Sequence, residues 1–268
     1  ETAMIYLNAS AARFMHCGRA FHLGIIEGWK PSTVGNNITF GTAFHLYAHL
    51  KALGDIFAIA KAVEFYGKEP CTITHNKLTK QHLIDVCAAH SVRSSPYVVI
   101  NDGTPNAASE LKFHIPVNNE IVFCGTIDNL VTDSNGLVYI RDYKTTSSNP
   151  AGFFNHFLLS NQFIAYQLAI RTHQRAFPAS LLASYKIAGI VIEAIFLSSA
   201  NVKFETSQPF THSDETLDFY QEQLETFKIP EDKPHGKFNG TCRTCSFSSW
   251  CNGFKEGYIR QPYSPVGD

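Results

Sequence analysis

The pattern of apolar and polar residues predicts two consecutive β-strands near the middle of the chain. The first spans residues 120–128 and reads Glu-Ile-Val-Phe-Cys-Gly-Thr-Ile-Asp, and the second spans residues 137–144 and reads Leu-Val-Tyr-Ile-Arg-Asp-Tyr-Lys. Residues 132–136 between them are dense in turn formers and end in Asn-Gly, a pair that favours tight hairpins. The pattern therefore predicts a β-hairpin that brings Asp128 and Asp142 close together.

Helical spacing of apolar residues dominates the preceding segment. It predicts helices over residues 43–53, 56–66 and 80–89, so that residues 41–95 are mainly helical. Two further helices are expected over residues 153–177 and 214–227, the second with Ser213 as its N-cap. Between them, the β-branched residues of segment 184–206 predict a buried strand pair with a turn near residues 198–201. Helices and strands alternate, which indicates an α/β protein.

The composition limits the possible classes of protein. The 268 residues are 44% hydrophobic, enough for the core of one elaborated domain or of a domain with a subdomain. No apolar run approaches about 20 residues and no N-terminal segment resembles a secretory signal, so we expect neither a membrane span nor export. A cytoplasmic location fits reduced thiols. We therefore treat the chain as a cytoplasmic α/β protein.

The net charge of −1 disfavours broad electrostatic binding to nucleic acid. A local basic lining combined with aromatic stacking in a narrow channel remains compatible with it. The candidates for such a lining are Lys77, Lys80, Arg93, Arg141, Lys144, Arg171, Arg175 and Lys186.

The predicted hairpin carries candidate chemistry. Asp142 and Lys144 are two residues apart on one strand, so both side chains leave the same face. Together with Asp128, they place two carboxylates and an amine near one point. Carboxylate oxygens bind hard divalent cations, and a neighbouring lysine can position a water molecule for phosphodiester hydrolysis. An isolated Asp-x-Lys also suits an ordinary solvated strand, so the flanking sequence decides between the two interpretations.

Two predicted helices flank this hairpin. Gln162 and Tyr166 are four residues apart and share a helical face, which a helix following the second strand can bring to the carboxylates. Upstream, a helix entered through Gly41 presents His45, whose imidazole is a potential metal ligand.

The ordered motifs Gly41-x-x-x-His45, Gly125-x-x-Asp128, Asp142-x-Lys144 and Gln162-x-x-x-Tyr166 resemble the RecB-like branch of the PD-(D/E)XK nuclease superfamily. The resemblance implies that Mg²⁺ or Mn²⁺ is bound by His45, Asp128 and Asp142, with the backbone carbonyl of Tyr143 completing the shell. It further implies that Lys144 orients the attacking water and that Gln162 and Tyr166 support the site and contact substrate. Glu110 matches a further acidic residue that this family often carries before the first strand.

The cysteines form a second pattern. Cys242, Cys245 and Cys251 follow a C-x₂-C-x₅-C spacing within an odd total of seven cysteines, which argues against a paired disulfide framework. Three clustered thiolates require a fourth to hold either an iron–sulfur cluster or a tetrahedral zinc ion. Cys17 is the candidate for this fourth ligand. The segment around it, residues 10–23, resembles the stretch around the first cluster cysteine of iron–sulfur RecB-like nucleases, although Gly18 stands in place of the expected proline.

That resemblance implies a 4Fe–4S cluster held by Cys17, Cys242, Cys245 and Cys251, which would tie the two ends of the chain together. Zinc remains the alternative, because the ligand type alone does not separate the two metals. The remaining thiols of Cys71, Cys87 and Cys124 have no comparable spacing and are interpreted as small buried or half-buried residues.

We therefore expect a restriction-endonuclease-like α/β core with a helical insertion and an iron–sulfur subdomain that joins the N- and C-terminal segments. The expected boundaries are a lead-in over 1–40, the insertion over 41–95, the nuclease core over 96–228 and the cysteine segment over 229–268. The resemblance, strongest to CRISPR-associated members and virus-encoded relatives, implies a metal-dependent exonuclease on single-stranded DNA ends.

Two other interpretations stay open. One is a non-catalytic DNA-end-binding subunit of a recombination or CRISPR adaptation complex, and the other is a zinc protein in which the Asp-Tyr-Lys run is coincidental. Assembly into an oligomer and partnership with recombination or CRISPR adaptation proteins are compatible with the resemblance.

Overall fold

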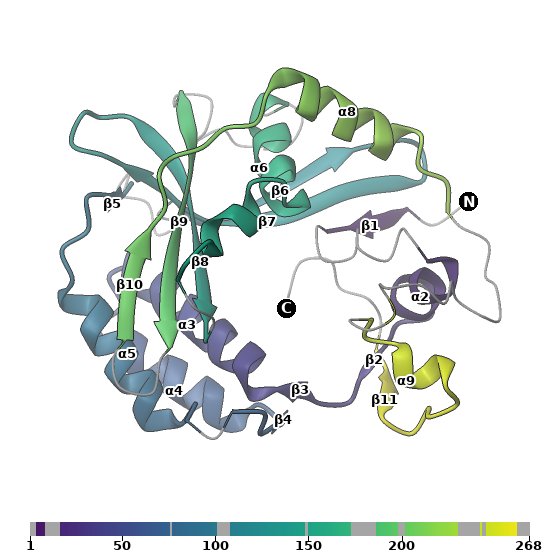
Figure 1. Ribbon diagram of the computed structural model, residues 1–268, viewed down its shortest axis with the longest axis horizontal. Coiled ribbons are helices and arrows are strands. Elements are labelled where there is room, and N and C mark those ends of the chain that lie inside the picture. The colour runs from purple at the N-terminus through teal and green to yellow at the C-terminus, as the bar shows by residue number, and fades with distance from the viewer. Residues whose placement is uncertain are drawn as a thin grey trace.

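The structure is a computed structural model that describes residues 4–8, 17–75, 77–100, 108–147, 150–172, 186–197, 202–229, 242 and 245–261. Its centre is a mixed seven-stranded sheet (Figure 1) in which the main path runs β1-β7-β8-β9-β10, while β5 and β6 also pair with β7. The strands are β1 (Ile5–Leu7), β5 (Val98–Val99), β6 (Ser109–Pro116), β7 (Ile121–Thr132), β8 (Val138–Thr146), β9 (Ile187–Leu197) and β10 (Val202–Thr206).

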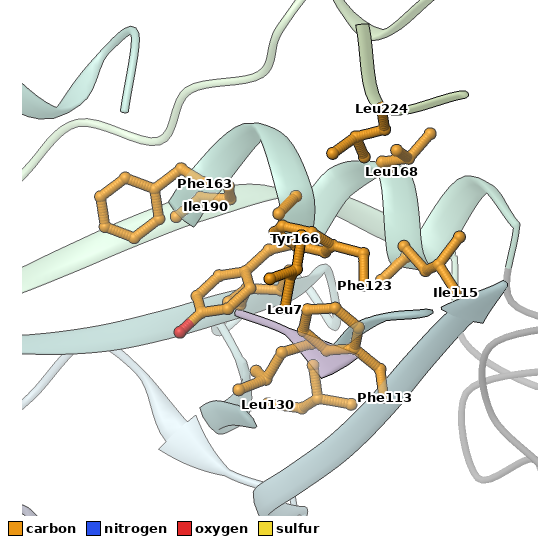
Figure 2. Close-up of a cluster of buried hydrophobic side chains, with 14 of the residues drawn as sticks. Leu7, Phe113, Ile115, Phe123, Leu130, Phe163, Tyr166, Leu168, Ile190 and Leu224 are labelled. Atoms are coloured by element: carbon orange, nitrogen blue, oxygen red, sulfur yellow. The ribbon is translucent and has the colours of Figure 1, made fainter. Parts of the chain in front are cut away.

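Helices cover the sheet, and each face has its own core. Alternate residues of β8 and β9 point to opposite faces: Tyr143 and Ile195 pack with the group α3 (Asn36–Ala52), α4 (Ala58–Lys68) and α5 (Lys80–Val92). Ile140 and Ile192 belong to the other core, which includes residues of α6 (Asn161–Arg171) and α8 (Asp214–Glu225). Figure 2 shows this second core, with Phe163 and Tyr166 of α6 above side chains from the strands.

The predicted α/β class and most of the predicted elements are confirmed. The hairpin is formed by β7 and β8, the buried strand pair by β9 and β10, and Ser213 caps α8 by accepting a hydrogen bond from the Thr216 amide. The turn expected near residues 198–201 lies outside the described residues. The helix expected over 153–177 is shorter, because Ser160 caps the start of α6 and residues Phe153–Phe157 form a separate 3₁₀ turn, η3.

Gly41 does not open its helix, contrary to the sequence prediction. Helix α3 begins five residues earlier, at Asn36. The buried Asn36 side chain donates to the His75 carbonyl oxygen (2.9 Å) and accepts from the Thr74 and His75 amides (3.1 Å each). This anchor to a distant loop, together with burial of Phe40, extends the helix beyond what local spacing shows.

Residues 17–31 and 245–261 meet in a small unit with its own two-stranded sheet. Strand β2 (Trp29–Pro31) pairs antiparallel with β11 (Tyr258–Arg260), and α2 (Gly18–Phe21), the π-helical turn η2 (His22–Ile26) and α9 (Ser248–Cys251) lie beside them (Figure 1). A short two-stranded sheet of β3 (Val34–Gly35) and β4 (Cys71–Thr72) follows. Among the described helices, none is long and apolar enough to cross a membrane.

Candidate active site

The candidate site lies at a gap along one edge of β7. On this edge β1 pairs with residues 121–123 and β8 pairs with residues 129–132, whereas β6 lines the opposite edge. The β7–β8 ladder ends at the pair Asn129 and Arg141, and Asp128 and Asp142 come directly after it. Beyond this point β8 continues with β9 alone on its other side. Residues 142–144 therefore face an opening in the sheet instead of a neighbouring strand.

Asp128 is held from two sides of this opening. Its Oδ2 accepts a hydrogen bond from the backbone amide of Tyr143 (2.8 Å), which the end of the ladder has released from strand pairing. The same oxygen lies 3.1 Å from Nδ1 of His45 on α3. The hairpin and the helix before it therefore meet at one carboxylate oxygen.

Asp142, Lys144 and Gln162 form a connected group. The Gln162 side chain donates from Nε2 to Asp142 Oδ1 (3.0 Å) and accepts at Oε1 from Lys144 Nζ (3.0 Å). Asp142 is fully buried, and its Oδ2 lies 2.5 Å from Lys144 Nζ without a hydrogen bond of regular geometry. Asp142 Oδ2 is consequently a buried anionic oxygen with capacity for a further ligand.

Tyr166 ties α6 to the hairpin. Its hydroxyl donates to the Thr126 carbonyl oxygen (2.7 Å) and accepts from Gln162 Nε2 (2.7 Å), and it lies 3.4 Å from Asp142 Oδ1. The side chain is buried, so within the described contacts it supports Gln162 and Asp142 rather than lining open space.

Glu110 joins the site through an unusual backbone conformation. It has φ of 54°, the only non-glycine residue with positive φ among the described residues. Ligand atoms of Glu110, His45 and Asp128 all lie within 4.8 Å of one another. The sequence supplied this residue only as a match to a family position and left it outside the expected metal-ligand set. No local pattern shows the left-handed turn that directs it inward.

The carboxylates and the imidazole perturb one another. Burial raises the pKa of Asp142 to about 6, with Asp128 adding to the effect and Lys144 opposing it. Burial and the charge of Asp128 likewise raise the pKa of Glu110 to about 7. Burial opposes ionisation of Asp128, but His45, Lys144 and the Tyr143 amide outweigh it and lower its pKa. Burial also lowers the pKa of His45, yet Asp128 and Asp142 raise it to about 9. The site concentrates negative charge that a bound cation would offset.

The two motif glycines are places of close approach. A Cβ on Gly125 would come within 2.5 Å of the Phe113 ring, which lies across the strand pair. A Cβ on Gly41 would come within 2.9 Å of Thr145 Oγ1 on β8. The glycine in each motif therefore lets an element carrying a site residue pack tightly against its neighbour.

Three of the basic residues expected to line a DNA channel are engaged elsewhere. Arg93 and Arg141 both contact the buried carboxylate of Glu193, and Arg171 lies 2.7 Å from Asp218. Arg175 lies outside the described residues. Lys144 contacts the candidate site residues Asp142 and Gln162.

The four cysteines expected to hold a cluster gather in the unit formed by the chain ends. None of the four forms a disulfide, and burial together with the charges of Cys245, Cys17 and Cys242 raises the pKa of Cys251. Trp29, Trp250 and Tyr258 surround them. The remaining cysteines fit their predicted environments, since Cys87 and Cys124 are buried and Cys71 is half-buried.

Comparison with known proteins bears on this arrangement. The PD-(D/E)XK nuclease superfamily matches residues 9–252 of the chain. None of the curated proteins matches. A solved structure described as "Crystal structure of SSO0001" is 14% identical, with 82% of this chain and 86% of that chain covered, at a TM-score of 0.34; a likeness this distant supports no conclusion. Since the family match spans most of the sequence, the protein belongs to the PD-(D/E)XK nuclease superfamily, for which metal-dependent phosphodiester hydrolysis is implied.

Proposed function

We propose that this protein is an Mg²⁺- or Mn²⁺-dependent deoxyribonuclease that acts on the ends of single-stranded DNA. The observation that carries the proposal is the gap between β1 and β8, where His45, Glu110 and Asp128 place their ligand atoms within 4.8 Å of one another. Asp142 and Lys144 lie beside them on β8, linked by Gln162.

The residues present fit a hard divalent cation. Asp142 Oδ2 is buried without a regular hydrogen bond, and the carboxylates of Glu110 and Asp128 add oxygen donors. The Tyr143 amide points to Asp128, and in an extended strand the carbonyl of the same residue points to the same edge. This supports Tyr143 as the backbone ligand, beside His45, Asp128 and Asp142. When bound, such an ion would polarise the scissile phosphate and lower the pKa of a bound water.

Lys144 is assigned the positioning of the attacking water. Its ammonium is fixed between Asp142 Oδ2 (2.5 Å) and Gln162 Oε1 (3.0 Å), and it keeps a further N–H to donate. Gln162 and Tyr166 hold this arrangement, because Tyr166 anchors the Gln162 amide to the Thr126 carbonyl through its hydroxyl. These residues prepare the site by fixing donor and acceptor directions before substrate arrives.

Aromatic and apolar side chains beside Lys144 support a single-stranded substrate. The Lys144 ammonium lies 5.9 Å from the ring centre of Phe157, which is half-buried. The adjoining Leu158 and Leu159 are 44% and 77% exposed. Unpaired bases present apolar faces that such surfaces bind without sequence preference. A neutral protein can in this way bind DNA without a broad basic surface.

The test is degradation of end-labelled single-stranded DNA with Mn²⁺, Mg²⁺ or EDTA. We expect metal-dependent loss of label that disappears in Asp142→Asn, which keeps the size and the acceptor for Gln162. Asp133→Asn is the matched control, because Asp133 lies in the hairpin turn and bonds only to turn residues and Tyr139. Equal degradation by the Asp142 variant would refute the assignment.

Circular single-stranded DNA distinguishes an exonuclease from an endonuclease. An enzyme that requires an end leaves the circle intact while degrading its linear form. If the metal-loaded protein cleaves no single-stranded, double-stranded or flapped DNA but retains binding to DNA ends, the non-catalytic subunit replaces the nuclease proposal.

We further propose that Cys17, Cys242, Cys245 and Cys251 bind a 4Fe–4S cluster. The support is four cysteines, contributed by segments more than two hundred residues apart and close enough to raise the pKa of Cys251. Four sulfur donors also suit zinc. An iron–sulfur cluster gives a brown protein with visible absorption that dithionite bleaches, whereas a zinc form is colourless. If elemental analysis finds one zinc ion and no iron per chain, the four cysteines bind zinc and the cluster proposal is wrong.

Recombination or CRISPR adaptation proteins are the partners that the motif resemblance suggests, and antiviral defence is the corresponding process. Co-purification of the tagged chain with such proteins, and its mass in solution by light scattering, are the measurements that decide these partnerships and an oligomeric state.

A further inference from the structure

A cavity of about 380 Å³ lies on the sheet face opposite Gln162. Asp142 and Lys144 contact α6, whereas Arg141 and Tyr143, which alternate with them along β8, point to the other face and line this cavity. The rest of the wall comes from α3, the end of α5, the segment around β5, and β9. Its size falls within the range of small-molecule sites.

The cavity wall carries excess positive charge. Lys51, Arg93 and Arg141 contribute three cations, and Glu193 contributes the one carboxylate. His90 also lines the cavity and is mostly uncharged at neutral pH because burial lowers its pKa. Phosphate groups bind where Arg and Lys donors converge in this way.

Arg141 is poorly satisfied for a buried guanidinium. Its side chain is 6% exposed, and it donates one regular hydrogen bond, from Nη2 to Asn129 Oδ1 (3.1 Å). Its Nη1 lies 3.5 Å from Glu193 Oε2, its Cζ lies over the Tyr143 ring at 4.8 Å from the ring centre, and its Nε has no hydrogen-bond partner. Leaving the donors of a buried charge unsatisfied is costly. An anion in the cavity would satisfy them.

The other wall is apolar. Tyr97, Val98 and Val99 around β5, with Ala48 of α3, line the cavity beside the cationic side, and Val98 is 64% exposed. Lys51 is exposed at the surface and donates to the His90 carbonyl oxygen (3.2 Å), which fixes it near the end of α5. A cavity lined by cationic, aliphatic and aromatic side chains together suits a phosphate joined to a flat ring.

We propose that this cavity is a binding site for the phosphate monoester of a nucleotide, separate from the carboxylate site at the gap in the sheet. Two sources share that chemistry: a free mononucleotide and the 5′-phosphate of a DNA strand. Because Tyr143 lines the cavity with its side chain and bonds Asp128 through its amide, the two sites are one residue apart along β8. The proposal goes beyond the nuclease activity and does not depend on it.

Isothermal titration calorimetry of the full chain in EDTA tests the site while divalent metal is removed. The probes are dAMP, deoxyadenosine, and a short oligonucleotide with either a 5′-phosphate or a 5′-hydroxyl. We expect saturable binding of one dAMP per chain, and at least tenfold weaker binding of deoxyadenosine. Lys51→Met and Arg93→Met should each weaken dAMP binding about tenfold, and Arg93→Lys should retain most of it. Lys68→Met, an exposed lysine of α4, is the matched control and should bind as the wild type does.

The outcomes separate this proposal from the nuclease assignment. Binding of dAMP but not of the phosphorylated oligonucleotide supports a free nucleotide, and phosphate-dependent binding of the oligonucleotide supports a DNA end. Binding should persist in Asp142→Asn even when cleavage is lost. The proposal is overturned if dAMP and the phosphorylated oligonucleotide both fail to bind, which would indicate a water-filled cavity. It is also overturned if folded Lys51→Met and Arg93→Met bind dAMP as tightly as the wild type.

Discussion

At the scale of single residues, the candidate site depends on side chains that hold other side chains. Gln162 contacts both Asp142 and Lys144, so it fixes an acid and a base that would otherwise form a simple ion pair. Glu110 reaches the same region only because its backbone adopts a positive φ. Such outliers cost about 1–3 kcal/mol and persist where the surrounding structure enforces them. Substitutions of Gln162 and Glu110 therefore test the positioning of site residues separately from the loss of a charge.

Replacing Gln162 by alanine should lower kcat about 10–100-fold, the usual effect of losing a group that orients a site residue. Lys144 would keep its contact with Asp142 but lose the acceptor that aims it. Steady-state cleavage of single-stranded DNA measures the effect, with Mn²⁺ affinity expected to change little. Gln223→Ala on the exposed face of α8 is the control, and an unaltered kcat in Gln162→Ala would remove the positioning role.

Replacing Glu110 by glycine should stabilise the metal-free fold while weakening Mn²⁺ binding. Glycine adopts φ of 54° without the steric penalty of about 1–2 kcal/mol that other residues carry there. Glu110→Gln separates the two effects, because it removes the charge but retains the side chain at positive φ. Urea unfolding in EDTA should rank the glycine variant about 1 kcal/mol above the glutamine variant, and both should bind Mn²⁺ less tightly than the wild type. The reverse stability order would show that the backbone is not strained.

At the scale of elements, alternation along β8 and β9 assigns different chemistry to the two sheet faces. Asp142 and Lys144 face the carboxylate site, while Arg141 and Tyr143 face α3 and α5. Glu193 of β9 is 1% exposed. Its carboxylate contacts Arg93 and His90 at the end of α5 and Arg141 on β8. This buried carboxylate therefore connects a helix with two strands.

Replacing Glu193 by glutamine should destabilise the protein by about 3–5 kcal/mol at pH 7, the usual effect of removing one partner from a buried ion pair. Burial opposes ionisation of Glu193, but His90, Arg141 and Arg93 outweigh it and lower its pKa below the ordinary 4.5. The carboxylate therefore contributes its full stabilisation above about pH 4.5 and loses it as the pH falls through the lower folded-state value.

Urea unfolding at pH 7 and at pH 3.5 checks this dependence. The difference in free energy of unfolding between wild type and Glu193→Gln should be smaller at pH 3.5 than at pH 7. Glu64→Gln, which removes an exposed ion pair with Lys68, should change stability by less than about 1 kcal/mol at either pH. If the free energies of unfolding of wild type and Glu193→Gln differ by the same amount at both pH values, Glu193 is not ionised in the folded protein.

At the scale of the whole molecule, the chain ends meet in one unit. Strand β2 pairs with β11 more than two hundred residues later in the sequence, and the four clustered cysteines lie around this contact. Closing a loop of this length removes freedom from the unfolded chain, although the gain increases only logarithmically with length. A bound cluster would therefore act mainly on stability and lie apart from the carboxylates.

Replacing Cys17 by serine should remove the visible absorption of the purified protein and lower its melting temperature by about 5–10 °C, since 1 kcal/mol shifts a domain of this size by about 2–4 °C. Thermal unfolding followed by circular dichroism gives the shift. Cys71→Ser is the control, because Cys71 is a half-buried thiol on β4, and it should retain the absorption. Full absorption in Cys17→Ser would exclude Cys17 as a ligand.

The sequence alone predicted the order of the elements and named most residues of the candidate site. Hydrophobic periodicity is local, so it identified the hairpin, the helices of segment 41–95, the β9–β10 pair and α8 before any long-range contact was known. The motifs likewise singled out Asp142 and Lys144, because residues two apart on a strand share a face. The predicted hairpin added Asp128 from the neighbouring strand. The structure then brought them together with His45, Gln162 and Tyr166.

Only the tertiary structure decided where the sheet opens and which charged side chains pair with one another. The β7–β8 ladder stops at Asn129 and Arg141 because β8 continues with β9 alone, and no local pattern encodes that end. The early start of α3 depends on Asn36 bonding to a loop almost forty residues away. Arg141 lies beside Glu193 of β9, a pairing between strands that the local sequence does not show. Contacts between distant segments depend on packing of the whole chain, whereas periodicity reports only the neighbours of each residue.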